Sequence, residues 1–115
     1  REVRLKYRDT DIRRAHTTIA VIATDAVLTS AGAKRLAITA HDGFSRAIWP
    51  SHTPVDGDLV FSLATGASGL SPQADHAIDL YAHAASTMAR AIARGVYLAR
   101  AEHRDTMPTW SAQHG

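Results

Sequence analysis

The run TIAVIAT, from Thr18 to Thr24, decides how this chain folds. It is apolar on both faces of an extended chain and rich in β-branched residues, which is typical of a strand buried inside a sheet. A second run of this kind, DLVFSLAT, extends from Asp58 to Thr65. Because a helical segment joins the two buried strands, we expect a layered α/β architecture in which helices cover a sheet.

Two segments have helical periodicity. From residue 31 to 48, apolar residues recur at spacings of three and four; Thr29 or Ser30 can cap the start of this helix, and Pro50 ends it. A longer helix is expected from about residue 74 to 101, with an apolar stripe flanked by alanines that allow close helix contact. The stripe contains Ile78, Tyr81, Ala85, Met88, Ile92 and Tyr97.

The pattern differs at both ends of the chain. Val3, Leu5 and Tyr7 alternate with basic residues, which predicts a half-exposed strand followed by a polar linker to residue 16. Residues 17–101 form the predicted α/β domain, and residues 102–115, without periodicity, are expected to form a mobile tail. The order is strand, linker, strand, helix, strand, helix. Three strands seldom complete a sheet covered on both faces, so we expect the chain to be a fragment whose partner strands lie elsewhere.

Composition excludes several classes of protein. There is no cysteine, which excludes disulfides, thiolate metal sites and a cysteine nucleophile. No apolar run approaches the ~20 residues of a membrane span and no secretory pattern is present, so a cytoplasmic protein without membrane contact is expected. Residues 1–14 hold six basic and three acidic residues, but Tyr7 is their one aromatic residue, so no set of aromatic residues interleaves to stack on bases. We therefore interpret the basic ends as solvated faces and expect no nucleic-acid partner.

The junction between the linker and the first buried strand could carry chemistry. If the peptide bond between His16 and Thr17 is cut, Thr17 gains a free α-amine. That amine, with a pKa of roughly 7.7–8.0, can serve as the base for the hydroxyl of the same residue. The alternative from composition is structural, since threonine is favoured at strand starts.

The triplet Asp56-Gly57-Asp58 stands at the start of the second strand. Two such carboxylates could orient a nucleophile or share a proton, and the alternative is an ordinary turn. A divalent-metal hydrolase is a further hypothesis, because imidazoles and carboxylates bind such metals. Its candidate ligands are His41, Asp42, His52, Asp56 and Asp58. Their spacing matches no compact ligand motif, so no metal site is expected.

Three motifs in order resemble one family. They are HTTIAVIATD (His16–Asp25), AKRLAITAHDGFSRAI (Ala33–Ile48) and HTPVDGDLVFSLATG (His52–Gly66). Together they are similar to the β-subunit of the self-cleaving amidohydrolases of the P1 peptidase family, which includes aminopeptidases and nylon-oligomer hydrolases. The TTIAVIATDA run and the DGD triplet resemble the nylon-oligomer branch most. The resemblance spans roughly residues 1–100.

The resemblance implies a site and a reaction. The family's precursor cuts itself before a Ser or Thr, which falls on Thr17 here, after His16; the nylon branch usually has Asn in place of that histidine and the aminopeptidases have Gly. The family's paired acids fall on Asp56 and Asp58, which would orient Thr17 and manage its proton. Thr17 would attack a small linear amide, either a peptide N-terminus or a 6-aminohexanoate-type oligomer, through an acyl-enzyme. No metal or other cofactor is required.

The resemblance also implies partners. The family fold is a four-layer αββα sandwich, in which residues 1–16 would be the end of the α-subunit and the chain would be incomplete without the upstream part. That α-subunit supplies a Lys or Tyr and an Asn that serves the oxyanion, so we expect the isolated chain to be inactive. Pairs of α- and β-subunits would assemble into larger oligomers. The alternative is a non-catalytic remnant or interaction module of this fold.

The second motif bears on the metal hypothesis. His41 and Asp42 belong to the family's helix pattern and not to its catalytic set. We expect them to form a packed pair beside a tight helix contact that Gly43 makes possible.

Overall fold

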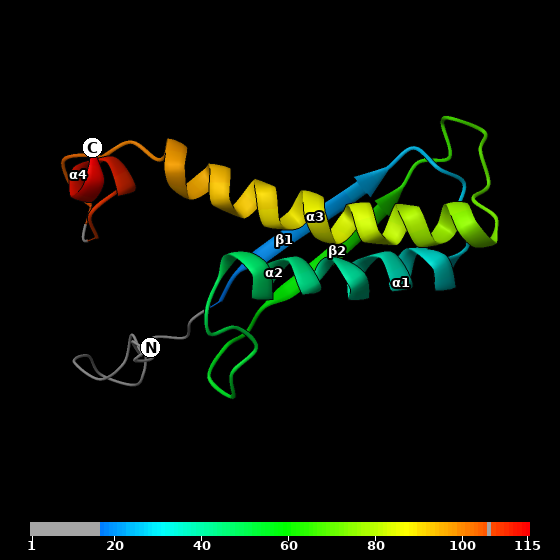
Figure 1. The fold of residues 1–115 in the computed structure, drawn as a ribbon, viewed down its shortest axis with the longest axis horizontal. Helices are drawn as coiled ribbons and strands as arrows, with labels where there is room; N and C mark the ends of the chain where they lie inside the picture. Colours follow the sequence, from blue (N-terminus) through cyan, green and yellow to red (C-terminus); the bar gives the residue numbers. More distant parts are fainter. Residues whose placement is uncertain (1–16, 106) are drawn as a thin grey trace.

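The structure, a computed structural model, describes residues 17–105 and 107–115. Within them, two strands and four helices form a small mixed α/β fold, which confirms the predicted α/β class (Figure 1). The elements are β1 (Ile19–Thr24), α1 (Ser30–Ala40), α2 (Asp42–Ala47), β2 (Leu59–Ala64), α3 (Ala74–Leu98) and α4 (Trp110–His114). The strand predicted around Val3–Tyr7 lies outside the described residues.

The two strands pair in parallel. Ile19 is the partner of Leu59, and the register continues to Thr24 and Ala64. Parallel pairing requires a crossover, which α1 and α2 provide on one face of the sheet. The strand starts therefore meet at one end of the sheet, although they are 40 residues apart in sequence.

The predicted helix from residue 31 to 48 is two helices, α1 and α2, separated at His41. The His41 amide N–H is shared between the carbonyls of Ala37 (3.3 Å) and Ile38 (3.2 Å), which tightens the end of α1. The start of α1 is as predicted, because Thr29 Oγ1 accepts a hydrogen bond from the Gly32 amide at 3.1 Å. The break at His41 starts a new helix that brings Gly43 against α3.

Gly43 makes the tight helix contact that its sequence context predicts. A Cβ at this position would lie 2.6 Å from the carbonyl oxygen of Ala85 and 2.6 Å from Cβ of Met88. Only glycine lets α2 approach α3 so closely. Of the expected packed pair beside it, His41 is half-buried and Asp42 is exposed, so only the histidine is packed.

The core lies between the helices and one face of the sheet. Its buried members are Ile22, Leu36, Ala40, Phe44, Val60, Ala84 and Met88. Phe44 and Leu36 are its largest fully buried side chains. The predicted stripe of α3 is wrong for Ile78 and Tyr97, which are both exposed. The C-terminal part of α3 extends beyond the layer formed by α1 and α2, so Tyr97 has no layer to pack on (Figure 1).

The opposite face of the sheet is apolar and open in the described part of the chain. Its side chains, between 44% and 67% exposed, are Ile19, Val21, Leu59, Phe61 and Leu63. The predicted burial of both strands depends on partner strands that lie elsewhere and stays a prediction, since within residues 17–105 and 107–115 only one face of the sheet is covered. Strands alternate their side chains between two faces, and here the helices cover one face only.

Two differences concern the C-terminal region. The helix predicted to reach residue 101 ends at Leu98, and the segment without periodicity contains the short helix α4. Thr109 caps α4 by accepting from the Ala112 amide at 3.3 Å. The mobility of residues 102–115 stays a prediction. Among the helices of the described residues, none is both long and apolar enough to cross a membrane.

Candidate active site

The parallel register places Thr17 beside Gly57. Both residues precede the first paired residues, Ile19 and Leu59, by two positions. A Cβ at Gly57 would lie 2.7 Å from Thr17 Oγ1, so the threonine hydroxyl lies against the backbone of Gly57. As a residue, Thr17 is exposed in the described structure.

Asp58 holds the backbone next to Thr17. The Thr18 amide N–H donates to Asp58 Oδ1 at 3.0 Å, and the Leu59 amide donates to the Thr18 carbonyl at 3.0 Å. The second carboxylate oxygen, Oδ2, lies 3.4 Å from Nδ1 of His52. The Asp58 side chain is only 8% exposed, so both of its oxygens are held by the protein.

Asp56 lies in the loop that leads to this point. Its Oδ2 accepts from the Thr53 amide at 2.8 Å, and its own amide donates to the Thr53 carbonyl at 3.0 Å. These two bonds close a turn over residues 53–56 and fix the position of the half-buried carboxylate. The turn interpretation of the DGD triplet and a role in a site are therefore compatible.

Three rings line the inner side of this loop. The His52 ring packs edge-on to Phe44, with centroids 5.8 Å apart, and lies 5.1 Å from the ring of His41. Burial lowers the pKa of His41 below its usual value of 6.5, and the neighbouring His52 lowers it further. Asp58 and Asp42 oppose this shift more weakly. His41 is therefore held towards its neutral form.

The structure thus assembles part of the predicted set. At the start of the two strands, Thr17 lies against Gly57 and Asp58 binds the amide of Thr18, and Asp56 lies two residues before Asp58. His16 lies outside the described residues. Sequence reasoning missed His52 as a partner of Asp58 and weighed it only as a metal ligand. Its place in the HTPVDGD motif, six residues before Asp58, was the available signal.

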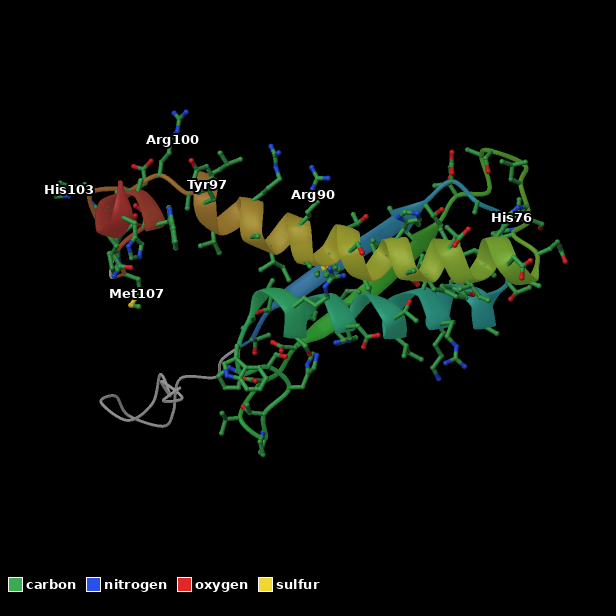
Figure 2. The ribbon with its side chains drawn as sticks, in the orientation of Figure 1. His76, Arg90, Tyr97, Arg100, His103 and Met107 are labelled. Atoms are coloured by element: carbon green, nitrogen blue, oxygen red, sulfur yellow. The ribbon has the colours of Figure 1, made fainter. Side chains whose placement is uncertain are left out.

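The metal hypothesis can be compared with the positions of the possible ligands. Within residues 17–105 and 107–115, no group of three or more histidine, aspartate or glutamate side chains could hold a metal ion. Arg90 and Arg100 point away from the side of α3 that faces α1 and α2 (Figure 2).

Thr17 and the acids of the loop can support nucleophilic chemistry. The Thr17 hydroxyl lies against the Gly57 backbone, and Asp58 holds the peptide unit that follows Thr17, so the hydroxyl is positioned before a substrate arrives. A free α-amine on the same residue would add a base within reach of that hydroxyl.

Comparison with known proteins places the chain in a family. Uncharacterized aminopeptidases of Mycobacterium tuberculosis (strain ATCC 25618 / H37Rv) and Mycobacterium bovis are each 48% identical over 91 residues, which cover 70% of this chain and 26% of theirs. An uncharacterized aminopeptidase of Mycobacterium leprae is 53% identical over 60 residues, 52% of this chain and 17% of its own. The chain spans about a quarter of the length of the first two relatives. Residues 2–107 match Peptidase family S58, and the chain belongs to that family.

Proposed function

We propose that this chain is the nucleophile-bearing part of a peptidase-type hydrolase that cuts small linear amides through Thr17. The observation that carries the proposal is the position of Thr17: its hydroxyl lies against Gly57, and the amide of the next residue, Thr18, is held by the Asp58 carboxylate. The family match and the aminopeptidase names of the relatives support the same class of reaction.

The proposed reaction begins with cleavage of the bond between His16 and Thr17. The freed α-amine takes the proton of the Thr17 hydroxyl while Oγ1 attacks the substrate carbonyl. The tetrahedral intermediate collapses, the substrate C–N bond breaks and the leaving amine takes that proton. The α-amine of Thr17 then takes a proton from water as the water attacks the ester carbonyl. The ester C–O bond breaks, the acid product leaves, and the proton passes from the amine to Oγ1 and restores the hydroxyl.

Asp58 and Asp56 are proposed to position the reacting groups. Asp58 binds the Thr18 N–H, so it fixes the peptide unit that carries the amine and hydroxyl of Thr17. Asp56, held by the turn with Thr53, would face the developing ammonium group from the loop. Neither role needs a metal or another cofactor, so chelators are expected to leave activity unchanged.

We further propose that a second sheet from the upstream part of the protein covers the open face of β1 and β2. Five exposed apolar side chains on one face of the sheet support this, because an apolar sheet face is normally covered by a second sheet or by helices. The result would be a four-layer αββα sandwich. The upstream part would also supply the oxyanion donors, whose loss costs about 10²–10³-fold in rate. The αβ units would then assemble into oligomers.

Two substrate classes remain within the proposal. The names of the relatives favour peptides cut at their N-terminus. The DGD triplet, by its resemblance to the nylon-oligomer branch, favours 6-aminohexanoate-type oligomers. Turnover of an amino-acid amide against that of a linear 6-aminohexanoate oligomer would distinguish them.

The test is the intact mass of the full-length protein that contains this chain. Two fragments divided between His16 and Thr17, together with amide hydrolysis, are expected. Thr17→Ala should abolish both while the fold persists. Thr18→Ala is the matched control, since the neighbouring hydroxyl has no proposed role and the backbone N–H that Asp58 binds is kept.

One result would favour the non-catalytic alternative. A single uncut mass without amidase activity in the wild-type protein would make this an interaction module or remnant. Residual self-cleavage in Thr17→Ala would show that Thr17 is not the nucleophile. An unchanged kcat in Asp56→Asn would count against Asp56 alone.

A further inference from the structure

His52 connects the candidate site to the helix layer. Its Nδ1 lies 3.4 Å from Asp58 Oδ2, and its Nε2 lies 3.3 Å from the carbonyl oxygen of His41. Asp58 in turn holds the Thr18 amide with its other oxygen. A continuous chain of polar contacts therefore runs from the junction of α1 and α2 to the residue after the proposed nucleophile.

Both ring nitrogens of His52 face acceptors. The carbonyl oxygen of His41 lies opposite Nε2 and the Asp58 carboxylate lies opposite Nδ1, and both groups only accept hydrogen bonds. The ring is therefore placed between the helix junction and the start of β2.

The backbone of His52 is held in an unusual conformation. Its φ of 57° lies in the left-handed region, which non-glycine residues seldom adopt and which clusters at functional sites. The ring is fixed from the other side by its edge-on contact with Phe44, which is fully buried. The left-handed turn and this core contact together aim the imidazole at Asp58.

We propose that His52 is a positioning residue for the hydrolysis, which clamps the Asp58 carboxylate so that this carboxylate fixes the backbone carrying Thr17. The inference rests on the function proposed above and adds a residue to it. Without the clamp, Asp58 keeps its charge but can rotate away from the Thr18 amide. A misplaced nucleophile then lowers the rate of the chemical step more than it weakens substrate binding.

The test uses two amide side chains that each replace one ring nitrogen. In His52→Asn, the side-chain amide would occupy the place of Nδ1, next to Asp58, and asparagine tolerates a positive φ. His52→Gln reaches the place of Nε2, next to His41, and leaves Asp58 without its partner. His52→Ala removes both contacts. Kinetics of amide hydrolysis and the rate of self-cleavage are measured in the full-length protein.

The expected result is a split between the variants. His52→Asn should keep kcat within about threefold of wild type, whereas His52→Gln and His52→Ala should lose about 10–100-fold in kcat with KM nearly unchanged. A packing role alone predicts the opposite order, since glutamine fills more of the space beside Phe44 than asparagine. His83 is an exposed histidine on α3, so His83→Asn serves as the control for replacing a histidine away from the site. Equal losses in the Asn and Gln variants, or no loss in any, would overturn the clamp.

A second readout does not depend on activity. The exchange of the Thr18 amide hydrogen with solvent is followed by NMR in the wild-type protein, in His52→Asn and in His52→Ala. With the clamp, the amide that Asp58 binds should exchange faster in His52→Ala and stay protected in His52→Asn; equal exchange in all three proteins overturns the clamp. An uncut and inactive wild-type protein overturns the proposed function, and the exchange rate then still decides whether His52 holds Asp58.

Discussion

Gly43 and Gly57 both lie where a side chain would collide, but they touch different parts of the molecule. A Cβ at Gly43 would meet the backbone of α3, at the carbonyl oxygen of Ala85 (2.6 Å) and the amide nitrogen of Ala89 (2.9 Å). A Cβ at Gly57 would meet one side-chain atom, Thr17 Oγ1, at 2.7 Å. The first contact serves the packing of two helices and the second serves the position of a single hydroxyl. Stability and activity should therefore separate between the two sites.

The largest effect is expected for Gly43→Ala. Backbone atoms of α3 cannot rotate out of the way, so the helices must move apart and the core around Phe44 must loosen. Overpacking of this kind costs about 1–3 kcal/mol, and contact with rigid backbone places this variant at the upper end. Urea unfolding of the full-length protein measures the loss. A free energy of unfolding equal to that of wild type would show that α2 does not depend on this close approach.

Gly57→Ala should have the opposite profile. The Thr17 side chain is exposed and can rotate, so the fold tolerates the new methyl group, but the hydroxyl leaves its place. We expect self-cleavage and turnover to slow by about 10–100-fold with little change in the melting temperature. A time course of precursor cleavage by mass spectrometry measures the effect. If stability falls while cleavage continues at the wild-type rate, the contrast between the two glycines is lost.

Gly95 is a third glycine for comparison with Gly43 and Gly57, because a Cβ at this position would contact no other atom in the described structure. It lies inside α3, and a Cβ there would meet nothing within 4 Å in the described structure. Replacing a helix-interior glycine with alanine should stabilise the protein by about 0.5–1 kcal/mol, because the unfolded chain loses freedom and nothing is displaced. Thermal unfolding measures the gain. A destabilised variant would reveal that this end of α3 is covered in the full-length protein.

The smallest effect concerns pH. Burial and His52 lower the pKa of His41 below 6.5, so the unfolded chain binds a proton there more readily than the folded chain. The contribution of His41 to stability is therefore present above pH 6.5 and is lost as the pH falls below that value. His41→Gln should remove this part of the pH dependence. The melting temperatures of both proteins between about pH 7.5 and 5 are compared, and parallel curves would contradict the shift.

Local pattern was enough to predict several elements. The TIAVIAT run becomes β1, the DLVFSLAT run becomes β2, and the cap at Thr29 and the tight contact at Gly43 lie where the sequence indicates. In each case the deciding signal is a residue type or a periodicity within a few positions. The family resemblance rested on three such motifs and is supported by the match to family S58.

Other features depend on residues far apart in sequence. The helix break at His41 brings Gly43 to α3, more than 40 residues away; the pair Asp42-Gly43 is a local turn signal, but it does not show which helix Gly43 will contact. The contact of His52 with Asp58 depends on a left-handed turn that histidine seldom adopts. Which face of the sheet this chain's own helices would leave open could not be predicted from the strand sequences, because an apolar strand looks the same whether its covering layer is near or distant in the chain.

The start of the sheet has a consequence for biosynthesis. Thr17 and Asp58 stand just before the starts of β1 and β2, so they come together only when the two strands have paired in their parallel register. On the proposed function, a nascent or misfolded chain has no assembled site and stays uncut. Self-cleavage would then depend on correct folding. Each cleaved molecule would be one whose strands have paired in the parallel register, and in a misfolded molecule the α-amine of Thr17 would stay blocked in the peptide bond to His16.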